Sequence, residues 1–350
     1  MCNLFYLVIK MSSYITEEIS FTDSGIRISG TLTLPKNEVN PCVILISGYG
    51  AETRDYTARG FNRYEFMADL LAKNGIASFR YDDRGCGKSS DVNWHNYTFD
   101  DLANEVIKIH SVLKNHHQTT SDGNPSIHPK KIGLFGHSLG ATIGPLAAST
   151  NDEFSFVISA APHGLIGVET ALHSRNALAK DGGETQEETK IQEEFLKKIL
   201  KDLQDEKTIG TALDILKQIM TKRYYKTIKE KERESVTFET FLQSTYEGFL
   251  LTLGDTPMYR SFLKFNPQDM YKKINCPILL LFAGNDLMHP SIIHRDVILT
   301  TLVEADKTVA IHDFSNANHG FTIIDNQQAT GFVDNFNETI IDWIREQFNV

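Results

Sequence analysis

The stretch LFGHSLGAT (Leu134–Thr142) places a serine between two glycines in the pattern Gly-x-Ser-x-Gly. The short apolar run that leads into it, residues 131–136, predicts a buried strand, and the small residues from Ser138 to Thr150 predict a helix. Ser138 is therefore expected at a sharp turn from strand to helix, which would lift its hydroxyl out of the sheet. A small-residue turn without any chemistry has the same pattern, so the surrounding chain must decide between the two.

The residues next to Ser138 fit a nucleophile elbow, the tight turn that presents a catalytic serine. Gly136 and Gly140 remove side chains that would collide with neighbouring backbone, and His137 lies between the first glycine and the serine. The N-terminus of the following helix supplies backbone N–H groups and the positive end of the helix dipole. The N–H of Leu139 is therefore expected to bind an oxyanion that develops on a substrate.

Apolar runs and amphipathic segments alternate on both sides of this turn. After an expected hairpin over residues 16–34, four short runs are apolar nearly throughout, as is typical of strands buried on both faces of a parallel sheet: residues 42–48, 76–82, 131–136 and 156–161. Helical periodicity lies between them, for example over Phe99–His116. The alternation predicts an α/β fold with a mostly parallel central sheet flanked by helices.

The alternation stops after Pro162 and resumes with the apolar run of residues 277–284. The chain between is strongly charged, and it predicts amphipathic helices at residues 191–203 and 209–220. The apolar face of the first consists of Ile191, Phe195, Leu196, Ile199, Leu200 and Leu203. We expect one α/β core, residues 12–164 and 266–350, with a helical cap (lid) inserted at 165–265, although surface helices that bury one face have the same pattern.

A serine hydroxyl is a poor nucleophile at neutral pH and needs a base that a third group orients. On a fold of this kind the acid and the histidine follow the serine in the chain, each just after a strand. Asp286 comes directly after the run of residues 277–284, and His319 lies a few residues beyond the last expected strand, 307–314. We therefore expect Ser138, Asp286 and His319 to form a catalytic triad.

Three nearby residues compete for these roles. His312 and Asp313 fall within or at the end of the last expected strand, where a side chain is more often packed or solvated than catalytic. His289 is too near Asp286 along the chain to take the place of the base. The order and the spacing favour Asp286 and His319.

The stretch SGYG (Ser47–Gly50) follows the third expected strand, from which a second oxyanion donor should come. Its glycines let the backbone approach a substrate, so we assign the donor to the N–H of Tyr49, whose ring would line the acyl pocket. A plain loop turn contains the same glycines.

The string YDDRGCGKSS (Tyr81–Ser90) ends like a phosphate-binding loop. Asp82 stands where that pattern needs a glycine, and the residues after Ser89 indicate a loop rather than a helix. We interpret Asp82, Asp83 and Arg84 as a charge network that holds the loops at the carboxyl edge of the sheet.

Composition excludes several classes of protein. A formal net charge of −10 disfavours nucleic acid or an anionic membrane surface as a partner. The four cysteines contain no CxxC pair, and His110, His116 and His117 have no ligand spacing and are expected to be solvated, so no metal or cofactor is expected. The apolar run Leu4–Ile9 is too short for a bilayer span or a signal peptide, and a cytoplasmic location is expected.

Taken in order, the segments SGYG, RYDDRGCGKSS, GHSLG, AGNDLMHP and NANHGF resemble the α/β-hydrolase family over essentially the whole chain. The runs SGYGAETRD, LLAKNGIASFRYDDRGCGKS and TPMYRSFLKFNPQDMYKKINCPILLL are similar to the capped bacterial and archaeal carboxylesterases. The resemblance implies an α/β-hydrolase fold and ester hydrolysis through an acyl-enzyme, with Ser138 as nucleophile, His319 as base and then acid, and Asp286 as orienting carboxylate. Two departures are Ser47 where many members have histidine, and Leu139 where close relatives often have glutamate, which bears on the acyl pocket.

These features predict a serine carboxylesterase for a small-molecule ester, aromatic (feruloyl-type) esters included. A thioesterase or a serine peptidase would use the same triad. Dehalogenases and epoxide hydrolases need an aspartate where Ser138 stands. A catalytically silent binding protein on a hydrolase scaffold typically lacks a triad member, and none is missing here.

Overall fold

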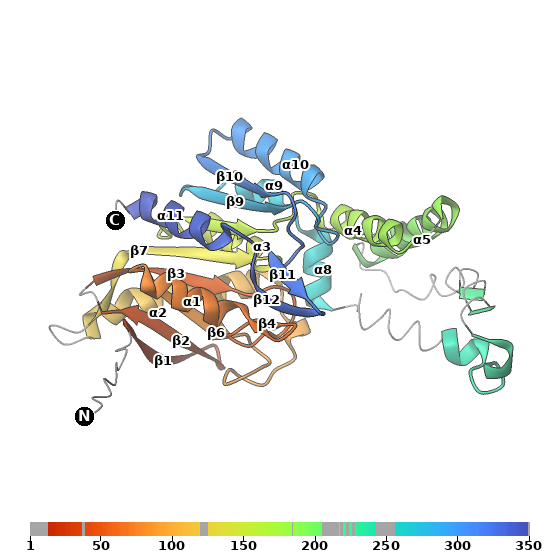
Figure 1. The fold of residues 1–350 in the computed structure, drawn as a ribbon, viewed down its shortest axis with the longest axis horizontal. Coiled ribbons are helices and arrows are strands. Elements are labelled where there is room, and N and C mark those ends of the chain that lie inside the picture. The colour runs from red at the N-terminus through yellow and green to blue at the C-terminus, as the bar shows by residue number, and fades with distance from the viewer. Residues whose placement is uncertain are drawn as a thin grey trace, which may run out of the picture.

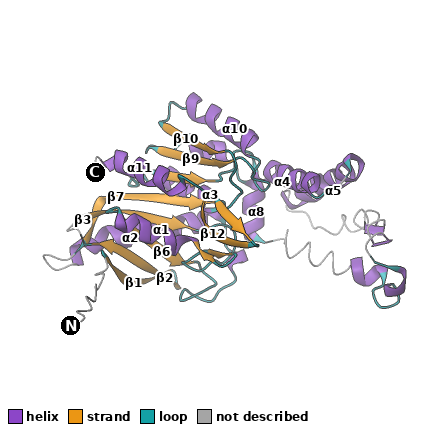
Figure 2. Ribbon diagram, viewed as in Figure 1, coloured by secondary structure: helices purple, strands orange, loops and turns teal. Residues whose placement is uncertain are grey.

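The computed structural model describes residues 13–36, 39–119, 125–183, 185–204, 217, 220–221, 224–225, 228–242 and 256–348. Its centre is an eight-stranded sheet, shown in Figures 1 and 2. The strands are β1 (Tyr14–Asp23), β2 (Ile26–Pro35), β3 (Val39–Ile46), β6 (Ala77–Asp82), β7 (Ser126–His137), β8 (Val157–Ala160), β9 (Ile278–Ala283) and β10 (Val309–Phe314). They lie in the order β1-β2-β6-β3-β7-β8-β9-β10.

β1 and β2 form an antiparallel hairpin, and β2 also pairs antiparallel with β6. From β6 to β10 every pair of neighbours is parallel. The mostly parallel sheet that the apolar runs predict is confirmed.

The middle strands are apolar throughout because both of their faces are buried. In β3, Val43 and Leu45 contribute to the hydrophobic core on one face of the sheet, while Cys42, Ile44 and Ile46 contribute to the core on the other. None of these five side chains is more than 3% exposed. Successive residues of a strand point to opposite faces, so a strand covered on both sides has no polar positions to alternate with.

Helices cover the two faces. Residues of α2 (Phe99–Thr119), α3 (Gly140–Thr150), α9 (Pro267–Tyr271) and α10 (Ser291–Glu304) belong to one core. Residues of α1 (Arg63–Lys73) and α11 (Phe336–Phe348) belong to the other. This is the three-layered, doubly wound arrangement expected from the alternating pattern.

The parallel strands end at one edge of the sheet, and this positions the loops that follow them. His137 at the end of β7 is paired with Ala160 of β8, and Ala283 at the end of β9 is paired with Phe314 of β10. The loops after β3, β7, β9 and β10 therefore all begin at this carboxyl edge.

Two small hairpins and a short turn were not predicted from the sequence. β4 (Thr57–Ala58) pairs with β5 (Phe61–Asn62), and β11 (Thr322–Asp325) pairs with β12 (Gln328–Phe332) directly after His319. A 3-10 turn, η1 (Trp94–Asn96), lies in the segment expected to be a loop. Such two- to five-residue elements are too short to show a hydrophobic period.

The prediction that His110 is solvated was wrong. Its side chain is 1% exposed, and its ring packs at 4.7 Å from that of Phe154, so the residue belongs to the interior beneath α2. His116 contacts Glu17 at 2.9 Å, and the side chain of His117 lies outside the described residues.

The segment between residues 165 and 265 contains α4 (Gly167–Asp181), α5 (Gln186–Gln204), η3 (Glu230–Glu232) and α8 (Pro257–Lys264). In Figure 1, α4 and α5 lie beyond the end of the sheet at which β7 meets α3. Of the apolar face predicted for 191–203, Leu196 and Leu200 are buried, while the other four side chains and nearly all of the helix expected at 209–220 lie outside the described residues. Within the described part of the chain, no helix has both the length and the apolar character needed to cross a membrane.

Candidate active site

Ser138 lies in the sharp turn between β7 and α3. Its φ is +56°, in the left-handed region that non-glycine residues rarely adopt, and its N–H donates to the carbonyl of Ala160 (2.9 Å). A Cβ on Gly136 would lie 2.0 Å from the carbonyl oxygen of Gly140, and one on Gly140 would lie 2.2 Å from that of Ile46. Both glycines are therefore required by close backbone packing, as a nucleophile elbow demands.

The structure joins Ser138 to Asp286 and His319, which come from the loops after β9 and β10. The Nε2 of His319 lies 2.9 Å from the Oγ of Ser138, and its Nδ1 lies 2.8 Å from the Oδ2 of Asp286. An ionised carboxylate only accepts, so Nδ1 carries the proton, Nε2 has a free lone pair, and the serine hydroxyl donates to it. This is the arrangement needed for proton transfer from serine to histidine.

The side chain of Asp286 is 1% exposed, and its carboxylate is held at both oxygens. Its Oδ1 accepts from the backbone N–H groups of Met288 and His289, each at 2.8 Å, while Oδ2 faces His319. Burial acts to raise the pKa of Asp286, but the hydrogen bond and positive charge of His319 outweigh it and hold that pKa below its usual value. The carboxylate is thus kept ionised and oriented.

The competing residues are engaged elsewhere. The ring of His289 bonds through Nδ1 to the carbonyl of Ala161 (2.7 Å), and burial lowers its pKa to about 4, so it is a neutral donor to a backbone oxygen. Asp313 pairs with Arg295 at 3.0 Å, and the ring of His312 packs 4.4 Å from that of Phe314. None of them takes the place of His319 between the acid and the serine.

Asp286, His289 and His319 are the described residues that could hold a metal ion, since each offers a ligand atom within 4.8 Å of the others. Two of these three side chains are already joined by the hydrogen bond that orients His319. A cation bound there would compete with the proton of that bond.

The loop predicted to donate to an oxyanion lies against the serine. A Cβ on Gly48 would come within 3.5 Å of the Cβ of Ser138, and Leu139 is the N-cap residue of α3. The side chain of Tyr49 is 46% exposed, and its ring meets the edge of Trp94 at 4.9 Å. Gly48, which precedes Tyr49, and Leu139 therefore lie next to Ser138, and the binding of an oxyanion by the N–H groups of Tyr49 and Leu139 stays a prediction.

Asp83 connects both ends of this loop. Its Oδ2 accepts from the hydroxyl of Ser47 (2.6 Å) and from the N–H of Glu52 (3.0 Å), which bracket residues 48–51. Burial, followed by the nearby charge of Glu105, raises the pKa of Asp83 to about 8, against the lowering effect of the bond from Ser47. One carboxyl group thus holds both ends of residues 48–51.

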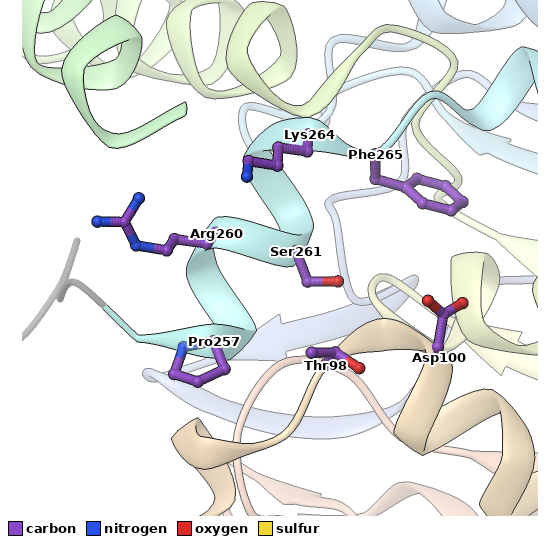
Figure 3. Close-up of a pocket in the computed structure, with 7 residues that line it drawn as sticks. All are labelled: Thr98, Asp100, Pro257, Arg260, Ser261, Lys264 and Phe265. Carbon is purple, nitrogen blue, oxygen red and sulfur yellow. The ribbon is translucent and has the colours of Figure 1, made fainter. Parts of the chain in front are cut away.

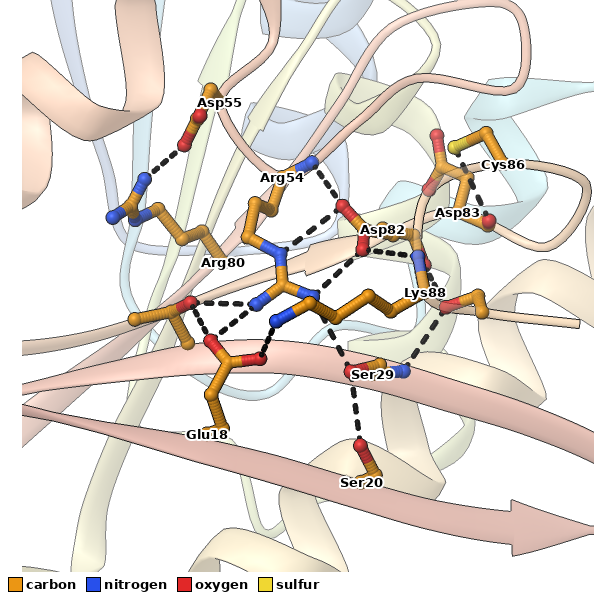
Figure 4. Close-up of polar contacts among 12 residues, drawn as sticks. Glu18, Ser20, Ser29, Arg54, Asp55, Arg80, Asp82, Asp83, Cys86 and Lys88 are labelled. Atoms are coloured by element: carbon orange, nitrogen blue, oxygen red, sulfur yellow. Dashed lines mark hydrogen bonds and ion pairs between the residues drawn. The ribbon is translucent and has the colours of Figure 1, made fainter.

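Asp82 holds the chain just beyond, as Figure 4 shows. It accepts from the N–H and the guanidinium of Arg54, the latter at 2.7 Å, and the same guanidinium reaches Glu18. It also accepts from the N–H of Lys88 (2.8 Å), and a Cβ on Gly87 would lie 2.3 Å from its carboxyl carbon. The backbone of the Gly-Lys-Ser string thus wraps an internal carboxylate, as expected for a loop-holding network rather than for a phosphate-binding loop.

Arg84, the third member of the predicted network, points inward. Its guanidinium makes two bonds, of 2.9 and 2.6 Å, to one carboxylate oxygen of Glu105 on α2, and both side chains are under 10% exposed. The pair ties the loop after β6 to a helix of the core.

An open groove lies apart from the triad, along α8, and is drawn in Figure 3. Its lining residues are Thr98, Asp100, Pro257, Arg260, Ser261, Lys264 and Phe265. Its volume is about 790 Å³, and none of the three triad residues lines it.

Sequence reasoning missed the role of Tyr56. Its hydroxyl lies 3.0 Å from the Nδ1 of His137, and it would sit only 2.1 Å from a Cβ on Gly48. The residue lies in an unpredicted turn, with a φ of +46°, and a lone tyrosine after a loop carries no sequence signal for such a contact.

Comparison with known proteins agrees with this fold. A sequence model of the family described as serine aminopeptidase, S33 matches residues 38–227, more than half of the chain. The chain belongs to this family of α/β-hydrolases. A search of the curated proteins gave no match.

Solved structures share the fold at low identity. The α/β-hydrolase GrgF from Penicillium sp. sh18 is 17% identical, with a TM-score of 0.53 over 96% of this chain and 100% of its own. The esterase Pf2001 of Pyrococcus furiosus is 14% identical, with a TM-score of 0.57 over 96% and 91%. The acylaminoacyl peptidase of Pyrococcus horikoshii is 15% identical, with a TM-score of 0.53 over 89% of this chain and 38% of its own. The protein is thus a hydrolase by family, and esterases and peptidases alike share its fold.

Proposed function

We propose that this protein is a serine hydrolase that cleaves carboxylic esters of small molecules through an acyl-enzyme. The observation that carries the proposal is the continuous hydrogen-bonded line from Asp286 through His319 to Ser138, with bonds of 2.8 and 2.9 Å. Such a line activates a serine hydroxyl that is otherwise a poor nucleophile.

In the first half of the reaction, the Oγ of Ser138 attacks the ester carbonyl while its proton passes to the Nε2 of His319. The carbonyl oxygen becomes an oxyanion, which the N–H groups of Tyr49 and Leu139 bind. His319 then gives its proton to the departing alcohol, and the acyl group stays on Ser138. Asp286 stabilises the positive charge on His319 at each stage.

In the second half, water attacks the acyl carbonyl and gives a proton to His319. The bond to Ser138 breaks, the proton returns to the serine oxygen, and the carboxylic acid leaves. No cofactor or metal enters this scheme.

The test is covalent labelling. A fluorophosphonate should modify Ser138, as located by peptide mass spectrometry, and Ser138→Ala should abolish labelling and lower kcat by about 10⁶-fold without changing the circular dichroism spectrum. Absence of labelling at Ser138, or activity that survives Ser138→Ala, would contradict the proposal. A silent binding protein would give the first of these results.

A peptidase is the second candidate, because the matching family is described as serine aminopeptidase. We favour an ester because the side chains next to Tyr49 are aromatic: the ring of Trp94 at 4.9 Å and that of His95 at 6.2 Å. Rings of this kind provide apolar area against which an apolar or aromatic acyl group can pack. A panel of p-nitrophenyl esters and hydroxycinnamates should give higher kcat/KM than matched aminoacyl p-nitroanilides, and the reverse order would favour the peptidase.

We further propose that residues 165–265 form a cap over the core of residues 12–164 and 266–350. The hydroxyl of Ser174 on α4 bonds to the carbonyl of Met288, in the loop that carries Asp286, and the ring of Phe262 on α8 lies 5.8 Å from that of His163. Removal of residues 181–234 should change the preference among esters more than the stability of the sheet. Unfolding of the shortened chain would contradict the division between the core and residues 165–265.

We also propose that the protein acts in the cytoplasm on an intracellular small-molecule ester and binds no nucleic acid, as its composition favours.

A further inference from the structure

We propose that Tyr56 and His137 form a positioning relay that fixes the backbone of His319 and the oxyanion loop relative to the serine turn. The inference rests on the proposed function, because it assigns how the reacting groups of that site are held. Neither residue reaches the reacting atoms, so both are positioning residues.

His137 occupies the elbow between Gly136 and Ser138, and its side chain is 5% exposed. Its Nε2 lies 2.7 Å from the carbonyl oxygen of His319, and its Nδ1 lies 3.0 Å from the hydroxyl of Tyr56. The two rings of His137 and His319 have their centroids 5.0 Å apart. A residue of the serine turn is thus bonded directly to the main chain of the residue that acts as base.

The direction of each bond follows from the chemistry of its partners. A backbone carbonyl only accepts, so the Nε2 of His137 carries a proton and donates to His319. In a neutral imidazole the other nitrogen must then accept, so the hydroxyl of Tyr56 donates to Nδ1. Burial, together with the charges of His319 and Arg63, holds the pKa of His137 well below its usual value and keeps the ring in this neutral state.

Tyr56 is itself fixed firmly enough to act as a reference point. Its N–H donates to the carbonyl of Thr53 (2.8 Å), its carbonyl accepts from the Nε of Arg63 (3.1 Å), and the guanidinium of Arg63 stacks 3.7 Å from its ring. Only 6% of the residue is exposed. Its hydroxyl therefore has a defined position against the oxyanion loop.

Contact with that loop completes the relay. The space beside Gly48 is filled by the hydroxyl of Tyr56, which would lie 2.1 Å from any Cβ there. The same oxygen that bonds to His137 thus limits how far the backbone before Tyr49 can move. One chain of contacts, from Gly48 through Tyr56 and His137 to His319, sets the distance between the oxyanion donor and the base.

The first test is the full-length protein with Tyr56→Phe, measured on a p-nitrophenyl ester. We expect kcat to fall about tenfold with KM changed less than about twofold, because loss of one buried hydroxyl releases a positioning contact but touches no substrate group. Tyr64→Phe is the matched control: its hydroxyl is equally buried and bonds to the carbonyl of Ile46 (2.6 Å), and its ring lies 5.0 Å from that of Tyr56. It should lose similar thermal stability and keep kcat within about twofold.

The second test uses His137. Gln at this position can still donate toward the carbonyl of His319, whereas Leu cannot, so His137→Leu should lower kcat about a hundredfold and His137→Gln clearly less. If the two residues act as one relay, adding Tyr56→Phe to His137→Leu should lower kcat no further. Should the leucine variant fail to fold, the same comparison is made with His137→Gln.

The proposal is overturned if Tyr56→Phe and Tyr64→Phe lower kcat equally, if the effects at positions 56 and 137 multiply, or if kcat is unchanged in the folded variants. Labelling of the wild-type protein by a fluorophosphonate separates these results from failure of the proposed function. If the wild type is labelled and active and the variants are unaffected, only the relay proposal is refuted. If the wild type is not labelled, the proposed hydrolase function, on which the relay rests, is refuted.

Discussion

Replacement of Asp286 by asparagine tests the triad most directly, because the structure determines how the new amide would lie. Backbone N–H groups of Met288 and His289 both donate to one oxygen of the carboxylate, each at 2.8 Å. In Asp286→Asn the amide oxygen is expected to keep these two bonds, since the opposite orientation would set an NH₂ group against two donors. The amide nitrogen then faces His319 and donates to its Nδ1.

This orientation forces the wrong tautomer on His319. With Nδ1 accepting, the proton moves to Nε2, which can no longer receive the proton of Ser138. The exchange of a carboxylate for an amide at such a position costs about 10⁴-fold in kcat in a serine protease triad, equivalent to about 5.5 kcal/mol of transition-state stabilisation. We expect a loss of this order in kcat for hydrolysis of a p-nitrophenyl ester. The melting temperature should change little, because the bonds to Met288 and His289 are kept.

Asp313→Asn is the matched control, because the carboxylate of Asp313 pairs with Arg295 on the surface. We expect this variant to keep kcat within about twofold of the wild type. The reasoning is refuted if Asp286→Asn retains more than about a tenth of wild-type kcat, or if Asp313→Asn is equally impaired. The second result would mean that the acid had been assigned to the wrong loop.

Three further changes have defined outcomes. Gly136→Ala would place a methyl group 2.0 Å from a backbone oxygen and should abolish folding or cost several kcal/mol in urea unfolding, whereas Gly331→Ala, with no atom within 4 Å, should be neutral. Gly48→Ala should lower kcat severely, because the new Cβ would lie 2.1 Å from the hydroxyl oxygen of Tyr56. Adding Tyr56→Phe should restore part of the lost kcat, because it removes that oxygen and leaves the nearest ring carbon 3.2 Å from the Cβ. If the double variant recovers no activity, the contact between Gly48 and Tyr56 is not what limits kcat. Folding raises the pKa of Asp83 from 3.8 to about 8, so between these pH values the folded protein holds a proton on Asp83 that the unfolded chain has lost. The contribution of Asp83 to the free energy of unfolding is therefore lost as the pH rises from about 4 to about 8. Asp83→Asn should therefore flatten the decline in unfolding free energy between pH 5 and pH 8, and an unchanged slope would count against a protonated Asp83.

The sequence predicted the sheet and the chain order of the triad because both leave periodic or local marks. Continuous apolar runs such as residues 42–46 are the direct consequence of burial on both faces, and a glycine pair around a serine marks a turn that admits no Cβ. The acid and the base could be placed because a parallel sheet brings all of its carboxyl ends to one edge. Fold and triad candidates thus followed from rules that act over a few residues.

The features that the sequence did not predict depend on contacts between distant segments. Tyr56 and His137 are 81 positions apart in the chain, and they meet at the end of a turn in which the N–H of Tyr56 bonds to the carbonyl of Thr53. His110 was misjudged because its spacing from the other histidines of α2 does not show that Phe154 covers its ring at 4.7 Å. Neither contact produces a hydrophobic period or a motif in the sequence, so both become visible only in the folded structure.

The three triad side chains are oriented by main-chain groups as well as by one another. The N–H of Ser138 bonds to the carbonyl of Ala160, the carboxylate of Asp286 accepts two backbone N–H groups, and the carbonyl of His319 accepts from His137. Main-chain donors and acceptors survive substitution of the side chains they belong to, so Met288, for example, can change without loss of the bond that its N–H makes. A geometry fixed in this way depends little on the side chains of the surrounding loops, provided that the elbow glycines and His137 stay. Substrate preference can therefore diverge within the fold while the hydroxyl, the imidazole and the carboxylate keep their distances.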